Sequence, residues 1–223
     1  MSVKTNLLIA AAAVLGVSSV YAGGPEMMAS PAVSSFNPYF YSELGLGYAD
    51  TGYNDFYSSN MVDSQGVESL TGTKNDNGGL AVVGDMGYVL MPHFAIELGG
   101  GYLPEYKANY ERDSGSPDSE SWKVASWYAY GAARVDIDVF NKVNAYTKAG
   151  LAYRSMTITK DSDDLDDYYW APFFGAGASY DVRDNLYVAL EYNYVGSSND
   201  TNEGLTAPAV SLYLAKVGYK FNV

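Results

Sequence analysis

The stretch FFGAGASYDVRDNLYVALEYNY, residues 173–194, decides the fold. Side chains alternate with period two on either side of the turn Arg183-Asp184-Asn185, which is typical of a β-hairpin with one apolar face. The apolar face consists of Phe174, Ala176, Ala178, Tyr180, Leu186, Val188, Leu190, Tyr192 and Tyr194. The opposite face consists of Gly175, Gly177, Ser179, Asp181, Tyr187, Glu191 and Asn193. One face is therefore uncharged, and the other mixes glycine with charge.

The same alternation recurs along most of the chain. Its eight segments cover residues 40–48, 80–88, 94–102, 127–137, 145–154, 174–181, 186–194 and 213–221. Short turns alternate with long polar stretches between them, a spacing typical of antiparallel strands joined in sequence order. The long stretches, which we interpret as loops at one end of the sheet, cover residues 50–78, 103–122, 155–170 and 196–208.

The charge distribution separates a membrane protein from a soluble one. In all eight segments the predominantly apolar face carries no charge, whereas every opposite face carries at least one. A soluble β-sandwich would turn a broad charged face to water, but here that face is rich in glycine, as a narrow lumen requires. Aromatic residues also gather at both ends of the apolar face. We predict an all-β fold, a transmembrane antiparallel up-and-down β-barrel with eight strands.

The N-terminal residues and the overall composition indicate how the rest of the chain is organised. Residues 1–22 have the charged, apolar and small-residue regions of a signal peptide, residues 23–38 read as a flexible N-terminal lead-in, and residues 39–223 as the outer-membrane β-barrel domain. The chain has no cysteine, and 26 acidic against 13 basic residues argue against a nucleic-acid partner. The single histidine, His93, falls in a predicted turn without a triad partner, so we expect no enzyme activity.

The charges on the glycine-rich face are expected to pair across strands, because burying them alone would cost several kcal/mol each. This predicted lumen ion-pair network consists of Glu43, Asp85, Glu97, Arg134, Asp136, Lys148, Arg154, Asp181, Glu191, Lys216 and Lys220. Barrel closure would place Lys216 between the strands of Glu43 and Glu191, and would let Lys148 and Arg134 reach Glu97. The network is either a structural plug or a gate that exchanges partners to pass small ions.

The last residues, Lys216-Val217-Gly218-Tyr219-Lys220-Phe221-Asn222-Val223, resemble the assembly signal of outer-membrane barrels. Residues 39–223 as a whole resemble the OmpA transmembrane-domain and opacity-protein group of eight-stranded barrels. The resemblance implies that Lys216, Gly218, Phe221 and Val223 are read by the barrel-assembly machinery, although the family usually ends in Phe. It also implies that a wall-tethering role through a following peptidoglycan-binding domain is not expected.

The loops carry the remaining candidate chemistry. The carboxylates of Asp161–Asp167 could bind Ca²⁺ or Mg²⁺ or share cations with lipopolysaccharide phosphates, but the stretch lacks the spacing and the glycine of a calcium-hand loop. We therefore read it as a solvated acidic loop and expect no metal ligands and no cofactor. Loop aromatics are candidates for an adhesive surface or for loop packing, namely Tyr53, Phe56, Tyr57, Tyr106, Tyr110, Trp122, Tyr168, Tyr169 and Trp170.

The sequence predicts a structural or surface-interaction protein that contributes to envelope integrity or adhesion, and the alternative is a low-conductance porin. Expected partners are outer-membrane lipid, lipopolysaccharide and a possible extracellular ligand, for a chain that works as a monomer.

Overall fold

The computed structural model describes residues 36–53, 69–74, 77–111, 120–160, 163–203 and 205–221. They belong to one compact unit, Phe36–Val223. The predicted signal peptide and all of the lead-in before residue 36 lie outside the described residues. Among the residues described, no helix is long and apolar enough to cross a membrane.

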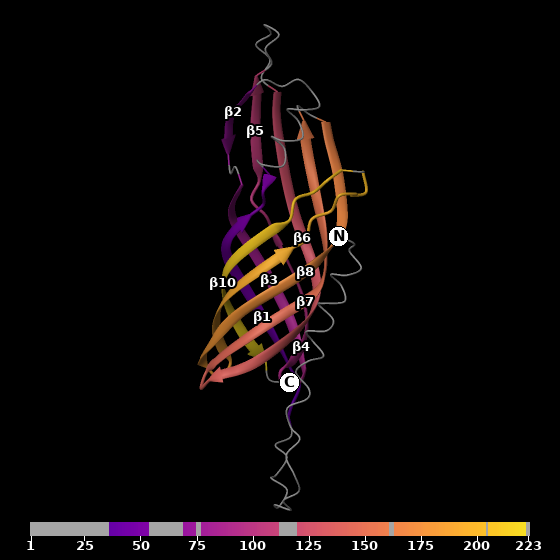
Figure 1. Ribbon diagram of the computed structural model, residues 1–223. Coiled ribbons are helices and arrows are strands. Elements are labelled where there is room, and N and C mark those ends of the chain that lie inside the picture. Colours follow the sequence, from indigo (N-terminus) through magenta and orange to yellow (C-terminus); the bar gives the residue numbers. More distant parts are fainter. Residues whose placement is uncertain are drawn as a thin grey trace, which may run out of the picture. The chain divides into compact units, whose positions relative to one another are not determined.

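The described strands form one antiparallel sheet that closes on itself (Figure 1). The strands are β1 Tyr39–Asp50, β2 Ser69–Lys74, β3 Gly78–Met91, β4 Phe94–Tyr102, β5 Tyr106–Glu111, β6 Glu120–Phe140, β7 Val143–Lys160, β8 Asp163–Arg183, β9 Leu186–Val195 and β10 Val210–Phe221. Neighbours follow the order β6-β4-β3-β1-β10-β9-β8-β7, and β7 pairs with β6 to close the ring. The predicted eight-stranded antiparallel barrel is confirmed.

Two of the described strands do not belong to the ring. β2 pairs with β5, and β5 pairs with β6 beyond the point where β4 ends. Together with residues 120–126 of β6, 155–160 of β7 and 163–169 of β8, they prolong the barrel at one end. We call this part the strand extension.

The prediction of long loops over residues 103–122 and 155–170 was wrong in part, because much of both stretches is strand. Aspartate has a low strand propensity and reads as a turn signal, but here threonines on the paired strand compensate. Thr157 donates a hydrogen bond to Asp166 at 2.8 Å, and Thr159 donates one to Asp164 at 2.7 Å. The predicted loop 50–78 likewise contains β2.

The opposite end of the ring has only short connections. Two-residue turns join β3 to β4, β6 to β7 and β8 to β9. His93 and Lys142, in the first two of these turns, have φ angles of 65° and 72°. This short-turn end is therefore compact, and the extension lies at the other end.

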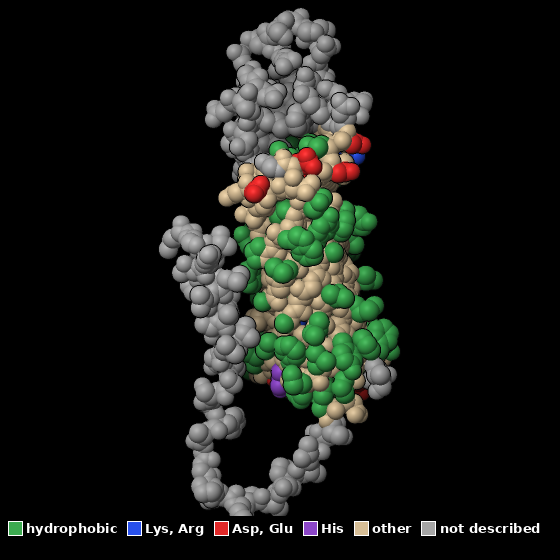
Figure 2. Space-filling model, turned by 90° about the vertical axis from the view of Figure 1, so that its right-hand side faces the viewer, with side chains coloured by type: hydrophobic (Ala, Val, Ile, Leu, Met, Phe, Trp, Pro, Cys, Tyr) green, Lys and Arg blue, Asp and Glu red, His purple; other side chains and the backbone are tan. Residues whose placement is uncertain are grey.

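The apolar face of the barrel points outward. Leu44 is 74% exposed and Leu190 is 70% exposed, whereas inward neighbours such as Glu43 are buried. Figure 2 shows hydrophobic side chains along the barrel wall and acidic side chains gathered near the extension end. A barrel wall with leucine outside and carboxylates inside is stable in lipid rather than in water.

Glycine and tyrosine are complementary on the inner face. The ring of Tyr41 occupies the space beside Gly87, and the ring of Tyr187 occupies the space beside Gly218, so a Cβ at either glycine would clash with the ring. Eight strands enclose little volume, and a large side chain fits only where its neighbour has none. This packing is one reason why glycine and tyrosine are both abundant, at 23 and 22 residues.

Candidate functional site

Seven charged side chains meet inside the barrel, and each residue is at most 6% exposed. They come from seven different strands of the ring. We call them the ion cluster: Glu43 on β1, Asp85 on β3, Glu97 on β4, Arg134 on β6, Lys148 on β7, Glu191 on β9 and Lys216 on β10. Four carboxylates thus face three cations.

Lys216 lies between acids from three strands. Its Nζ is 3.2 Å from Glu43 Oε2 and 2.5 Å from Glu191 Oε1, and it also pairs with Asp85. This is the position between Glu43 and Glu191 that closure of the last strand on the first predicts.

Lys148 and Arg134 complete the cluster. Lys148 Nζ lies 2.5 Å from Glu97 Oε1 and 2.7 Å from Glu191 Oε2. Arg134 Nη1 lies 3.0 Å from Glu43 Oε1 and 3.6 Å from Glu97 Oε2. Every carboxylate of the cluster therefore has a cation within 4 Å, as buried charges require.

Tyrosine hydroxyls supply most of the remaining donors, a role that the sequence analysis missed, and the Asn193 amide donates to Glu191 at 2.7 Å. Tyr41 donates to Glu97 at 2.6 Å, Tyr187 to Glu43 at 2.7 Å, and Tyr146 to Glu191 at 2.8 Å. The Tyr130 hydroxyl lies 2.7 Å from Asp85 and 2.5 Å from Glu97, and these two carboxylates share its one proton. The available signal was that all four tyrosines alternate onto the charged face.

Three predicted network residues lie nearer the short-turn end. Asp136 pairs with Arg134 at 2.9 Å, and Asp181 pairs with Lys220 at 2.7 Å. The carboxylates of Asp136 and Asp181 are about a quarter exposed, so these pairs border solvent rather than the sealed cluster.

Arg154 does not belong to the ion-pair network, which corrects the prediction. Its guanidinium is fully buried and donates to the hydroxyls of Tyr169 at 2.8 Å and Tyr53 at 2.5 Å, and to the carbonyl of Pro208 at 2.7 Å. Tyr53 also shares a hydrogen bond of 2.6 Å with Ser126. Among the described residues Arg154 pairs with no carboxylate. The three partners and Ser126 come from four separate parts of the chain. We call these residues, together with Arg154, the Arg154 clasp.

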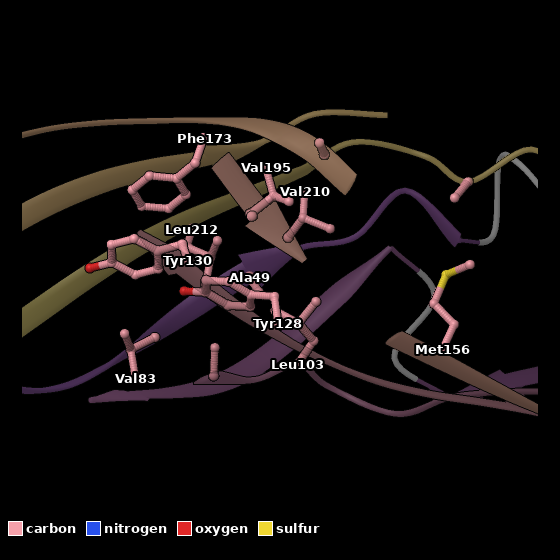
Figure 3. Close-up of a cluster of buried hydrophobic side chains, with 14 of the residues drawn as sticks. Ala49, Val83, Leu103, Tyr128, Tyr130, Met156, Phe173, Val195, Val210 and Leu212 are labelled. Carbon is pink, nitrogen blue, oxygen red and sulfur yellow. The ribbon is translucent and has the colours of Figure 1, made fainter. Parts of the chain in front are cut away.

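An aromatic layer separates the ion cluster from the clasp. Tyr130 stacks on Phe173 with ring centroids 3.9 Å apart, and on Tyr128 at 6.2 Å. Along the inner face of β6, Tyr130 and Tyr128 come between Arg134 of the cluster and Ser126 of the clasp. Figure 3 shows Tyr130 and Phe173 close together among apolar neighbours that include Val83, Val195, Val210 and Leu212.

Some of the predicted loop aromatics are buried inside the barrel, and others are exposed on its outer surface. Tyr53, Tyr106 and Tyr169 are buried, whereas Tyr168 and Trp170 are exposed on the outside. Phe56, Tyr57 and the side chains of Tyr110 and Trp122 lie outside the described part. Within the acidic stretch, the described side chains of Asp164, Leu165 and Asp166 are exposed, whereas Asp167 is buried. No group of three potential metal ligands occurs among described residues.

The residues of the predicted assembly signal lie on both faces of β10. Lys216 is part of the ion cluster, and Gly218 faces the ring of Tyr187. Phe221 points outward, is 46% exposed and packs edge-on against Tyr219. Val223 lies outside the described residues.

Comparison with known families adds to this geometry. The family model described as "Outer membrane protein beta-barrel domain" matches residues 9–221. The chain belongs to this family. Membership agrees with the closed ring and the apolar outer wall, and it supports a location in the bacterial outer membrane.

Individual relatives of this barrel are distant. Outer membrane protein A of Klebsiella pneumoniae is 23% identical over 174 residues, which cover 78% of this chain and 47% of the relative. Outer membrane protein A of Escherichia fergusonii is 21% identical over 178 residues, again 78% and 47%. The chain thus spans about half the length of the curated relatives it matches.

The solved structures that this chain resembles include two bacterial proteins. Neisserial surface protein A is 16% identical, with a TM-score of 0.49, and the match covers 82% of this chain and 97% of that one. The N-terminal β-barrel domain of Pseudomonas aeruginosa OprF is 14% identical, with a TM-score of 0.48 and coverages of 83% and 98%.

Proposed function

We propose that this protein is a non-conducting outer-membrane barrel that presents the strand extension at the cell surface, with a structural or surface-interaction role in envelope integrity or adhesion. The observation that supports this proposal is the filled lumen. The ion cluster, the aromatic layer and the Arg154 clasp follow one another along its axis, and each consists of buried side chains. A solute would have to displace all three.

Planar-bilayer recording of the refolded protein tests the closed lumen. We expect no discrete openings from the wild type. Glu43→Gln is expected to remain silent as well, because it removes one charge of the ion cluster and leaves the aromatic layer and the clasp in place. Bilayers exposed to detergent without protein are the control. Discrete openings that Glu43→Gln alters would contradict the proposal and establish the alternative, a low-conductance porin.

The strand extension is the part we propose to be displayed. In bacterial outer-membrane barrels the short turns face the periplasm and the longer connections face outward. The exposed rings of Tyr168 and Trp170 suit the membrane interface, and Asp164 and Asp166 lie beyond them on the same outer face. We therefore propose contacts with outer-membrane lipid and lipopolysaccharide at the aromatic level, and with an extracellular ligand beyond it.

Site-specific labelling tests this orientation. Because the chain has no cysteine, single substitutions give unambiguous sites. Thr157→Cys on the extension should react with a membrane-impermeant maleimide on intact cells. Asp184→Cys, in the exposed turn between β8 and β9, should react only after the outer membrane is permeabilised. The opposite pattern would refute the orientation.

Assembly and oligomeric state form the last part of the proposal. The barrel-assembly machinery would recognise the end of β10, where Phe221 points outward, and Phe221→Ala should reduce insertion into the outer membrane. Closure by the β6–β7 pairing leaves no strand of the ring with an unpaired edge, which supports a monomer.

A further inference from the structure

The short-turn end of the barrel contains a cavity of about 260 Å³. Arg134, Tyr41 and Tyr187 line this cavity and also bond to carboxylates of the ion cluster, so they form its floor. The cavity is open on the other side. We call it the periplasmic vestibule, since the short turns of such barrels face the periplasm.

Carboxylates and aromatic rings form the vestibule walls. Asp136, Asp138 and Asp181 line it together with Phe36 and Tyr39. Asp136 and Asp181 each have a cation partner. The side chain of Asp138, an exposed residue at the mouth of the cavity, has no ion-pair or hydrogen-bond partner within the described part of the chain. The wall therefore offers at least one carboxylate that no protein cation neutralises.

On this side of the aromatic layer the lumen has fewer cations than carboxylates. The described ion cluster and vestibule together contain seven carboxylates and four cations, which leaves a formal deficit of three positive charges. The predicted network has six acids and five cations, but Arg154 lies beyond the aromatic layer and Asp138, which lines the vestibule, was not part of it. Charges of one sign between low-dielectric walls concentrate counter-ions at the accessible mouth.

We propose that the periplasmic vestibule binds a small organic cation with primary ammonium groups, such as an aliphatic diamine. Ammonium groups donate to carboxylates, and the aromatic rings of Phe36 and Tyr39 suit both a methylene chain and a cation. The cavity is smaller than typical drug-sized pockets of roughly 300–1,000 Å³, which restricts the ligand to a short chain. The other titratable groups in the wall are His93, Arg134, Lys220 and the phenols of Tyr39, Tyr41 and Tyr187. Arg134 and Lys220 already pair with Asp136 and Asp181.

Calorimetric titration of the folded full-length protein with 1,4-diaminobutane at low salt tests this site. We expect saturable binding, and no binding of 1,4-butanediol, which has the same carbon chain without charge. Asp138→Asn should weaken binding roughly two- to fivefold, the range for one partly exposed charge pair. Asp138→Lys should abolish it. Asp184→Asn is the matched control, because Asp184 is exposed near the same end and does not line the vestibule.

Each variant is first checked for heat-modifiable gel migration, which reports a folded barrel. The proposal is overturned if no saturable heat appears, if the diol binds as well as the diamine, or if binding survives Asp138→Lys. Equal weakening by Asp138→Asn and Asp184→Asn would also overturn it, since it would indicate a diffuse charge effect. None of these outcomes depends on whether the lumen conducts.

Discussion

Replacing Lys216 with methionine is the most direct test of the ion cluster. Lys216 is 2% exposed and pairs with three carboxylates. Two of these carboxylates would keep another cation if Lys216 were removed. Glu43 keeps Arg134 at 3.0 Å, and Glu191 keeps Lys148 at 2.7 Å. The consequence therefore falls mainly on the remaining acid, Asp85.

Without Lys216, the one side-chain partner that Asp85 keeps among the described residues is the Tyr130 hydroxyl at 2.7 Å, which Glu97 shares. Removing one partner of a buried pair costs about 3–5 kcal/mol because the other charge stays buried and uncompensated. We expect Lys216→Met to lower the free energy of unfolding by that amount, measured by urea denaturation in lipid vesicles with the gel shift of the folded barrel as readout. Lys220→Met is the control, since its pair with Asp181 borders solvent and should cost under about 1 kcal/mol.

The double variant Lys216→Met with Asp85→Asn separates this mechanism from simple loss of packing. Neutralising Asp85 removes the uncompensated charge, so the double variant should be more stable than Lys216→Met alone. The reasoning is refuted if Lys216→Met lies within about 1 kcal/mol of the wild type, the value of an exposed pair. It is also refuted if the two substitutions are additive.

Three further predictions concern packing, membrane contact and pH. A Cβ at Gly150 would collide with the backbone of β6, so Gly150→Ala should lower the free energy of unfolding by about 1–3 kcal/mol. Gly84→Ala, whose Cβ meets a side-chain atom at 3.7 Å, should change it by no more than about 0.5 kcal/mol. Equal urea midpoints for the two variants would contradict this prediction. Leu190→Arg on the lipid face should lower the free energy of unfolding in vesicles by about 2–4 kcal/mol. Thr157→Arg on the strand extension should leave it almost unchanged. Similar losses in the two variants would contradict the proposed membrane boundary. Burial raises the pKa of Glu105, but hydrogen bonds from two lysines outweigh it and hold the pKa below its ordinary value of 4.5. The stabilisation from Glu105 is thus present above the unfolded-state pKa and lost as the pH falls through the folded-state value, and an NMR titration midpoint above 4.5 would contradict it.

The sequence determined the ring and the orientation of its side chains. In a strand successive side chains point to opposite faces, so a period of two assigns each residue to the inside or the outside without further information. Leu190 is exposed and Glu191 is buried, as the hairpin pattern predicts. The absence of charge from one face then identified that face as the one in contact with lipid.

Only the tertiary structure decided the height of each residue along the barrel axis. Lys148 and Arg154 share the inner face of β7, yet six residues correspond to roughly 20 Å along a strand, and the two cations belong to different layers. Which side chains share a layer depends on the tilt and stagger of neighbouring strands, and these depend on the closure of the whole ring. For this reason only the structure showed which carboxylates accept hydrogen bonds from Tyr41, Tyr130 and Tyr187, although the alternation of side chains had placed these tyrosines on the inner face.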